Sequence, residues 1–376
     1  MKKFNLSVSA LSFLVLLSAA CKKTDNPVDP PVVIPPVVVP PVGLSQYMKL
    51  EDMASLSGFT VLKDSTWADG SSHTLLLEPA LFNGLLILPS FQQKIYHGAI
   101  VKINSIGKNI APELVEQYEL NPVSVSSSNY YPGVKNPVIA NPSYLGTTTF
   151  LQNLLANYSG ANQSQSFTFN SFPFTHLNEL NIFFGGNVDI AALFHVKTKP
   201  AATVAKVRNG LVWKVSQINF SVDMSLHTSS IFKDPANDKL LQNENLSYIS
   251  SIEYGRMGLL AVQADTTRET LNVIVNRIKT SDPLTEAQLK IVANAEIHTY
   301  LNGYSASGIE AVQNAAGLQK IKGFMDLIQN PGTFSVSNYG SPLYYYMRNI
   351  VDYGRTLQDG YKVRIDVQRE KINSTK

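Results

Sequence analysis

The sequence predicts an α+β fold for most of a chain of 376 residues. Stretches in which apolar and polar residues alternate, as in strands, mix irregularly with stretches of helical spacing. Hydrophobic residues make up 44% of the chain and charged residues only 16%, which favours a folded protein over disorder or long coiled coils. The length is sufficient for two or three domains with a sizeable core.

The first twenty residues have the pattern of a secretory signal peptide. Lysines at positions 2 and 3 precede an apolar stretch over residues 11–17 and a small-residue cleavage region. The only cysteine of the chain follows directly, in the stretch Leu17-Ser18-Ala19-Ala20-Cys21. This stretch resembles a bacterial lipobox, so we expect Cys21 to be acylated and to attach the chain to membrane lipid. An ordinary signal peptide followed by an incidental cysteine is the alternative.

A proline-rich stretch follows the cysteine. Prolines occupy positions 27, 30, 31, 35, 36, 40 and 41, a density that excludes a helix or a central strand. Such a sequence forms a semi-rigid polyproline II spacer of about 3.1 Å per residue. We therefore expect residues 21–48 to form a lipidated tether and residues 49–376 to form the folded body. No later stretch has the 18 consecutive apolar residues that a conventional transmembrane helix needs.

In the body, alternation predicts strands and a 3.6-residue spacing predicts helices. The expected strands are Thr74–Leu77, Gly84–Leu88, Ala99–Ile103, Val212–Val222, Gly258–Ala264 and Lys362–Gln368. The expected helices are Pro112–Tyr118, Thr149–Tyr158, Arg268–Ile278, Thr285–Ala293 and Gly308–Ile328.

Two segments fit both periods. Over residues 270–278, Leu271 and Val275 fit one face of a helix, yet Leu271, Val273 and Val275 also alternate with polar residues as in a strand. Over residues 172–210, Val188 and Ile190 alternate with polar neighbours, while the nearby phenylalanines suit short packed helices. Helices that contain β-branched residues often permit both interpretations, so the pattern leaves the choice open.

One long stretch resembles the cholesterol-dependent cytolysin family. In that family a strand carrying Tyr-Gly-Arg runs into a Thr/Ser-rich junction and then a helix bundle, as Tyr248–Arg256 runs here into Gly258–Thr267. Four other stretches follow the order of the family: Tyr96–Ala99, Lys214–Val222, Leu301–Gly303, and Thr333–Ser335 with Pro342–Tyr345. None of these stretches is specific alone, and their shared order carries the resemblance.

The resemblance implies a membrane-attack-complex/cytolysin-like fold, with a bent and twisted antiparallel central sheet flanked by two helix clusters in an elongated body. It implies elongated connecting strands at about 49–95 and 352–376, an upper domain from about 96–170, 211–257 and 330–351, and a refolding pore-forming domain from about 171–210 and 258–329.

The chain also departs from the family pattern. It stops just after the strand expected at Lys362–Gln368, so we expect the C-terminal membrane-recognition domain to be absent, with its tryptophan-rich loop and sterol-binding pair. Cholesterol recognition is therefore not expected. Asn302 replaces one glycine of the family's glycine pair. The pattern is similar to the short cytolysin-like proteins of Bacteroidota, which suggests a longer partner.

The resemblance implies that both ambiguous segments are stored as small helices and refold into membrane hairpins. Strands cross a bilayer only in a closed barrel, and each strand needs about 9–11 residues, which both segments can supply twice. The resemblance assigns hinge or refolding roles to Gly303, Asn302, Gly255, Thr266 and Thr267, and membrane-hairpin positions to Val188, Ile190, Leu271, Val273 and Val275. A simple turn glycine is the alternative interpretation of Gly303.

The sequence offers no candidate enzyme site. The formal net charge is only +3 and no basic cluster is present, so no nucleic-acid partner is expected. The histidines are scattered without the spacing of a metal site, and no catalytic triad or phosphate-binding loop occurs. We expect no enzyme activity, no metal and no cofactor.

These expectations converge on a lipid-anchored protein of the outer membrane or cell surface. It would be one component of an oligomeric β-barrel pore, assembled with copies of itself or with a longer cytolysin-like protein. Arg277 counts mildly against this, because alternation puts it on the same face as Leu271, Val273 and Val275. The alternatives are a surface lipoprotein that binds glycans or mediates adhesion, and an inhibitor of a partner toxin.

Overall fold

A computed structural model describes residues 59–66, 72–79, 84–106, 111–129, 137–156, 166–196, 209–226, 230–352 and 362–368. The chain separates into two units, Met1–Gln46 and Tyr47–Lys376, and every described residue belongs to the second. The expected signal peptide, the acylation site Cys21 and the tether lie outside the described residues.

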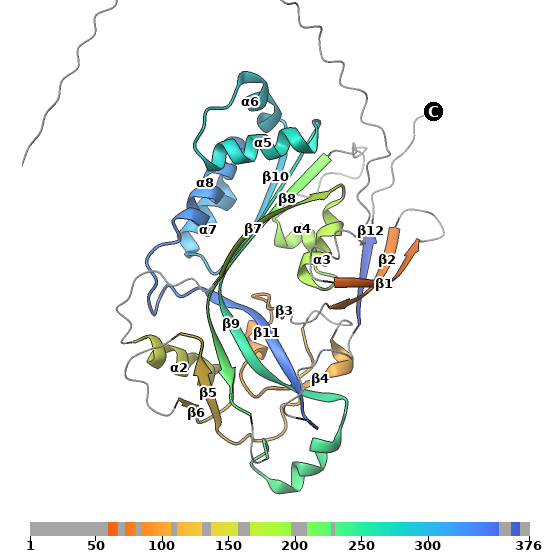
Figure 1. Cartoon of the computed structure of the whole chain (residues 1–376), viewed down its shortest axis with the longest axis vertical. Coiled ribbons are helices and arrows are strands. Elements are labelled where there is room, and N and C mark those ends of the chain that lie inside the picture. Colours follow the sequence, from red (N-terminus) through yellow and green to blue (C-terminus); the bar gives the residue numbers. More distant parts are fainter. Residues whose placement is uncertain are drawn as a thin grey trace, which may run out of the picture. The chain divides into compact units, whose positions relative to one another are not determined.

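The described part is built on a nine-stranded sheet around two long antiparallel strands, β8 (Asn209–Met224) and β9 (Leu246–Ala264). Their register runs from Asn209 opposite Ala264 to Asp223 opposite Ser251. Both strands curve strongly along their length (Figure 1). The other strands are β3 (Leu85–Leu86), β4 (Ile100–Lys102), β5 (Val123–Ser127), β6 (Val138–Ile139), β7 (Ser166–Phe174), β10 (Glu296–Asn302) and β11 (Ser341–Asn349).

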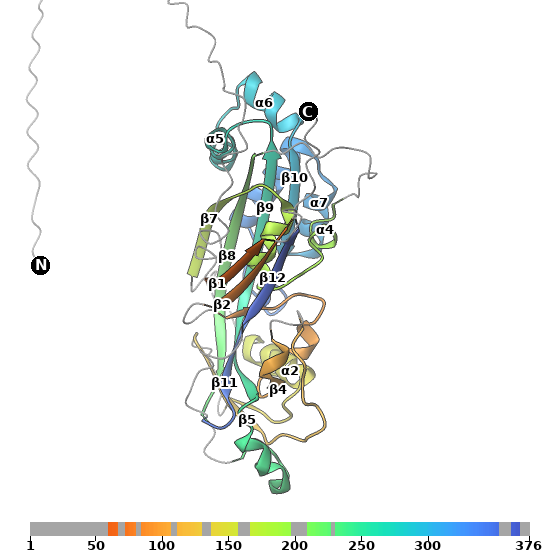
Figure 2. The same cartoon turned by 90° about the vertical axis from the view of Figure 1, so that its right-hand side faces the viewer.

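Strand β9 changes its neighbour part-way along one edge. β11 pairs with residues 247–255 of β9, and β10 pairs with residues 257–263. β7 pairs with β8 over the same upper part, so that β7, β8, β9 and β10 lie side by side there (Figure 2). The point at which β9 exchanges β11 for β10 therefore lies at Gly255–Met257.

Two helix clusters cover opposite faces of this upper sheet (Figure 1). The first cluster consists of η3 (Leu177–Leu180), α3 (Asn181–Phe184) and α4 (Ile190–Leu193). The second cluster consists of α5 (Arg268–Lys279), α6 (Glu286–Ala293), α7 (Ala306–Asn314) and α8 (Gly317–Gln329).

The upper strands β8 and β9 are buried on both faces because each face has its own core. Trp213 and Leu260 pack with the second cluster, whereas Val212 and Leu259 belong to the core that contains the first cluster. Strands covered on both sides are expected to be continuously apolar. This explains the unbroken apolar sequence of β9 from Gly258 to Val262.

Smaller elements complete the described unit. A second sheet, in the order β1-β2-β12, contains β1 (Phe59–Thr66), β2 (Ser72–Pro79) and β12 (Val363–Gln368). The remaining helices are η1 (Gln92–Lys94), η2 (Ile103–Ser105), α2 (Tyr144–Leu155) and η4 (Pro235–Gln242).

The predicted α+β class with a curved antiparallel sheet and two helix clusters is confirmed. Two expected helices are wrong. Residues 112–118 form no helix, because Glu113 and Val115 bond to the backbone at and beside β4 and the chain bends at residues 117–118. The helix expected over Gly308–Ile328 is two helices, α7 and α8, separated at Ala315–Ala316.

Other element boundaries differ in detail. α2 begins at Tyr144 rather than at Thr149, because the hydroxyl of Ser143 accepts a bond from the Gly146 N–H at 3.0 Å and caps the helix. The strand expected over Gly84–Leu88 is reduced to the two residues of β3. Strands β5, β7, β10 and β11 have no counterpart among the expected elements.

Candidate refolding segments and the glycine junction

Each helix cluster begins in the connection of a paired antiparallel hairpin. β7 ends at Phe174, which lies opposite Gly210 near the start of β8. β9 ends at Ala264, and β10 begins at Glu296 opposite Gln263. The first cluster thus lies between the adjoining ends of β7 and β8, and α5 and α6 lie between those of β9 and β10. Straightening either connection would lengthen two strands that are already in register.

The first cluster is held by burial rather than by its own helical bonds. α3 and α4 have four residues each, too few for independent stability. Ile182, Phe183 and Phe184 are at most 5% exposed. The expected hairpin residues Val188 and Ile190 are also buried, the latter at the start of α4. Tertiary packing therefore determines the helical form of this segment.

Short polar side chains bond the backbone of the first cluster. The carboxylate of Glu179 accepts from the Thr175 N–H at 2.8 Å. Oδ1 of Asn181 accepts from the Val188 N–H at 3.0 Å, and the carboxylate of Asp189 accepts from the Ala192 N–H at 2.9 Å. These side chains replace some of the backbone bonds that a longer helix would make.

Asn187 joins the first cluster to β12, on the edge of that strand that does not pair with β2. Its Oδ1 accepts from the Asp366 N–H at 2.8 Å, and its Nδ2 donates to the Arg364 carbonyl at 3.3 Å. A side-chain amide has the same donor and acceptor pair as a peptide group. Asn187 therefore bonds β12 as one residue of a neighbouring strand would.

The second cluster consists of longer, capped amphipathic helices. The hydroxyl of Thr267 accepts from the Thr270 N–H at 3.2 Å and caps α5. Thr285 and Gln288 form a reciprocal capping box at the start of α6. Thr266, the other threonine of the expected hinge, accepts at its carbonyl from Nδ2 of Asn209 at 2.8 Å. The expected hinge threonines thus mark the point where β9 becomes α5.

The expected hairpin residues of α5 occupy two different faces of the helix. Leu271 and Val275 are buried against the sheet, as their four-residue spacing requires, but Val273 is 47% exposed. In an extended strand all three side chains would share one face. Val273 is therefore apolar at a position where the helix places it in water.

Two cations near the end of α5 have specific contacts. Nη1 of Arg277 donates to the Pro283 carbonyl at 3.0 Å. Nζ of Lys279 lies 4.1 Å from the ring centroid of Phe169 on β7, a cation–π contact that joins α5 to that strand.

Three glycines meet where β9 exchanges β11 for β10. Gly303 and Gly340 have φ values of 83° and 100°, in the left-handed region that favours glycine. A Cβ at either position would lie about 2.2 or 2.1 Å from the carbonyl oxygen of Gly255. A Cβ on Gly255 would in turn lie 1.9 Å from the Gln217 carbonyl oxygen on β8. We call these three residues the glycine junction.

The expected hinge residues Gly255 and Gly303 thus lie against each other, and Asn302 is buried beside them as the last residue of β10. Asn302 lies opposite Met257. It keeps the regular pairing of β10, and the left-handed turn falls on Gly303.

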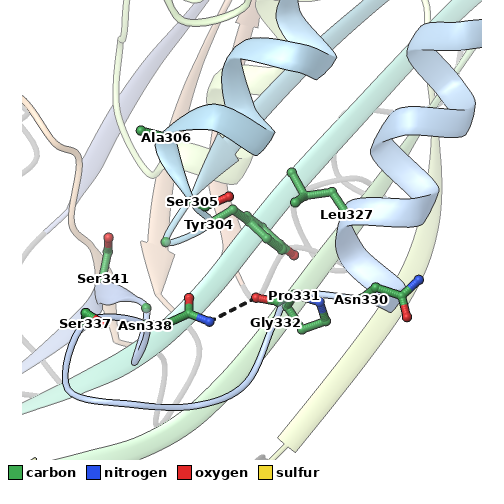
Figure 3. Close-up of a pocket in the computed structure, with 12 residues that line it drawn as sticks. Tyr304, Ser305, Ala306, Leu327, Asn330, Pro331, Gly332, Ser337, Asn338 and Ser341 are labelled. Carbon is green, nitrogen blue, oxygen red and sulfur yellow. Dashed lines mark hydrogen bonds between the residues drawn. The ribbon is translucent and has the colours of Figure 1, made fainter.

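A buried arginine holds the loop that closes this junction. Nη2 of Arg256 donates to the carbonyl and to Oδ1 of Asn338, both at 2.9 Å. Burial lowers the pKa of the Arg256 guanidinium below its usual value. A cavity of about 410 Å³ lies beside the loop, and Nδ2 of Asn338 donates across it to the Pro331 carbonyl at 3.2 Å (Figure 3). Tyr304 and Leu327 also line the cavity.

Several residues of this region were not among the sequence-based candidates. Gly340 has a usable signal, because it precedes a strand in the order Tyr-Gly-Ser. Asn187 and the Lys279–Phe169 pair have none, since their partners are distant in sequence. Among the described residues, no group of His, Cys, Asp and Glu side chains could hold a metal ion. No helix in the described ranges is long and apolar enough to cross a membrane.

Comparison with known proteins gives results for structures only, since no family model and no curated protein matches. Wild-type pneumolysin is similar with a TM-score of 0.55 at 15% identity, over 82% of this chain and 67% of pneumolysin. Listeriolysin O gives 0.52 at 16% identity, over 81% of this chain and 64% of that toxin. The fold is that of the cholesterol-dependent cytolysins. The resemblance found in the sequence is thus confirmed at the level of fold.

The same fold occurs in a non-hemolytic pneumolysin from Streptococcus pneumoniae strain ST306, with a TM-score of 0.53 at 13% identity, over 82% of this chain and 68% of that one. The present chain spans about two thirds of the length of each of these toxins. Because a non-hemolytic protein shares the fold, activity must be argued from the segments themselves.

Proposed function

We propose that this chain is a pore-forming component whose two helix clusters supply β-hairpins to an oligomeric barrel. The connectivity of the upper sheet carries this proposal, because residues 175–208 and 265–295 each join the adjoining ends of two paired antiparallel strands. Refolding would continue β7 with β8, and β9 with β10, without changing any existing register. Both connections have room for two strands of about 9–11 residues and a turn.

The exposed apolar side chain of Val273 supports the same proposal. As part of α5 it contributes little to the core, since it is 47% exposed. In a hairpin it would lie between Leu271 and Val275 on a continuous apolar face, as a lipid-facing strand requires. The helix and the hairpin use different subsets of one sequence, and Leu271 and Val275 serve both.

The lipobox-like sequence supports a lipid-anchored location for this component, at the outer membrane or cell surface. In this proposal Cys21 carries the acyl chains and the proline-rich stretch separates the body from the bilayer. The barrel would be assembled with copies of this chain or with a longer cytolysin-like chain that recognises the target membrane.

A matched pair of charge substitutions on α5 tests hairpin insertion. Val273 and Asn276 are both exposed in the helix, so lysine at either position should leave the fold intact. In the hairpin, residue 273 would face lipid and residue 276 the lumen. A lysine on the lipid face near the bilayer midplane costs about 2–4 kcal/mol in every subunit.

The measurement is release of a fluorescent marker from liposomes and from bacterial cells, with the purified chain alone and mixed with a longer cytolysin-like chain. We expect Val273→Lys to abolish release and Asn276→Lys to retain it. Equal release by both variants would contradict insertion of this hairpin. Absence of release by the unmodified chain in every mixture would contradict the proposed function.

A further inference from the structure

β10 is a single strand held between the two clusters. The side chain of Tyr300 belongs to the core that contains the first cluster, and the next residue, Leu301, belongs to the core of the second cluster. Both side chains are at most 7% exposed. Because successive side chains of a strand point to opposite faces, the two clusters each hold one face of β10.

Three aromatic rings form the contact on the first-cluster face. The ring of Tyr300 lies edge-on to Phe184 of α3, with centroids 5.4 Å apart and an interplanar angle of 85°. It also contacts the tilted ring of Phe194, which follows α4, at 6.5 Å. Phe184 and Phe194 contact each other at 6.4 Å. All three rings are at most 5% exposed, so the set behaves as one packed unit, which we call the ring cluster.

A polar contact joins the same elements at the surface. Nε2 of His195, directly after Phe194, lies 2.8 Å from Nε2 of Gln313 on α7. His195 has a φ of 52°, so the chain turns sharply to reach this position. The end of the first cluster is thus attached to β10 through the ring cluster and to α7 through His195.

On the opposite face, β10 packs against α8. A Cβ on Gly258 of β9 would lie 3.0 Å from the Phe324 ring and 3.3 Å from Leu301. Gly258 therefore lets Leu301 and Phe324 pack over the sheet. The two faces of β10 therefore have different neighbours, since Tyr300 packs with the first-cluster rings and Leu301 lies with α8.

We propose that Tyr300 couples β10 to the first cluster, so that these two segments open together. Moving β10 away from β9 would pull the Tyr300 ring out from between Phe184 and Phe194 and expose all three rings. Undocking the first cluster would expose Tyr300 and weaken β10. β10 and the first cluster are therefore expected to open together rather than independently.

The coupling is a property of the isolated chain, and only its role in pore assembly rests on the proposed function. Hydrogen exchange read by mass spectrometry measures it without any membrane, so failure of pore formation and failure of coupling are distinguishable. The unmodified chain should show one common opening rate for residues 177–194 and 296–302 under conditions where exchange reports opening directly. Different opening rates for these two segments would overturn the proposal.

Two neighbouring substitutions on β10 provide the matched comparison. Tyr300→Ala should raise exchange at least tenfold in residues 177–194 as well as in β10. Leu301→Ala weakens β10 from the opposite face, so it should raise exchange in α8 and, because β10 and the first cluster open together, over residues 177–194 as well. Tyr300→Phe keeps the ring and should behave as the unmodified chain. Unchanged exchange over 177–194 in either Tyr300→Ala or Leu301→Ala would overturn the coupling.

A reciprocal variant keeps the test valid if Tyr300→Ala does not fold. Phe194→Leu retains most of the side-chain volume but removes one ring of the ring cluster. It should raise exchange at least tenfold in β10, residues 296–302, although the substitution is more than 100 residues away in sequence. Unchanged exchange in β10 in this variant would overturn the proposal.

Discussion

The two helix clusters differ in what maintains their helical form. α5 and α6 carry their own start signals, with a threonine cap at Thr267 and a capping box at Thr285, and they bury one face. α3 and α4 are single turns surrounded by other elements, and although Asp189 caps α4, four residues form too few backbone bonds to hold either turn. A longer helix with local start signals can remain helical when it separates from the sheet. The single turns of the first cluster are too short to remain helical without their neighbours.

This difference assigns separate roles to the clusters. The first cluster should lose its structure as soon as it leaves the sheet, because its stability comes from buried rings. Refolding of the second cluster should cost additional free energy, because the capped helices α5 and α6 must unwind. The predictions below test this contrast, beginning with the largest expected effect.

Removing one ring from the first cluster should have the greatest effect on stability. Phe183 is 5% exposed and packs edge-on against Phe172, with centroids 4.9 Å apart. Phe183→Ala should lower the free energy of unfolding by about 4 kcal/mol, measured by urea denaturation. Leu271→Ala in α5, at a site 1% exposed, should cost about 3 kcal/mol. A larger loss for Leu271→Ala would reverse the ranking of the clusters.

The glycine junction should tolerate a methyl group less well than the second cluster does. Gly303→Ala would place its Cβ about 2.2 Å from the Gly255 carbonyl oxygen at a φ of 83°, so we expect a loss of about 3 kcal/mol. Gly317, the first residue of α8, also has positive φ, but a Cβ there has no heavy atom within 4 Å. Gly317→Ala should therefore cost only about 1–2 kcal/mol.

Thermal and urea unfolding of the two glycine variants would measure this difference. Equal losses would mean that the left-handed backbone alone, and not the close approach of β9, requires glycine at residue 303. The sequence-based alternative of a simple turn glycine would then be sufficient for Gly303.

Loss of the hydrogen bonds between Asn187 and β12 should lower the free energy of unfolding by less than the Gly303→Ala change above, and its effect should be confined to β12. Asn187→Ala removes two hydrogen bonds to the backbone of an exposed edge, and we expect a loss of about 1.5 kcal/mol. Exchange of the Asp366 amide should rise in this variant. Asn276→Ala in α5, where the side chain only bonds Asn272 one turn away, should change the free energy of unfolding by less than about 0.5 kcal/mol. Unchanged exchange at Asp366 would contradict a direct bond to β12.

The same contrast explains how much the sequence could predict. α5 and α6 were predicted nearly to the residue, because amphipathic spacing and caps are local signals. The helices α3 and α4 could only be described as short and packed, since a four-residue turn depends on its neighbours. Gly255 and Gly303 were identified from a family resemblance, but their contact with Gly340 required the register of β10 and β11 on β9.

Errors in the sequence-based prediction have a related cause. Residues 112–118 have helical spacing, yet backbone bonds between Glu113, Val115 and the chain around β4 prevent a helix there. β10 was missed because its alternation is incomplete: polar Thr299 lies between Ile297 and Leu301 on one face, and Tyr300 lies among polar residues on the other. Tyr300, which carries the proposed coupling, therefore had no sequence signal.

The smallest expected effect is the contact that attaches the second cluster to the edge strand β7. Nζ of Lys279 lies 4.1 Å from the centroid of the Phe169 ring, and both residues are partly exposed. Cation–π contacts at such sites are worth about 0.5–1 kcal/mol. A double-mutant cycle with Lys279→Met and Phe169→Leu should give a coupling free energy in this range, because methionine keeps most of the aliphatic chain and loses only the charge.

A coupling near zero would mean that the Lys279–Phe169 contact does not attach α5 to β7, and that the end of α5 is held by the bond from Nε2 of Gln329 on α8 to the Lys279 carbonyl and by the packing of its buried face. A coupling in the expected range would show that α5 is joined to β7, the strand that leads directly into the first cluster. The second cluster would then contact both strands that border the first connection, β7 and β8, and its release would loosen the hairpin from which the first cluster emerges.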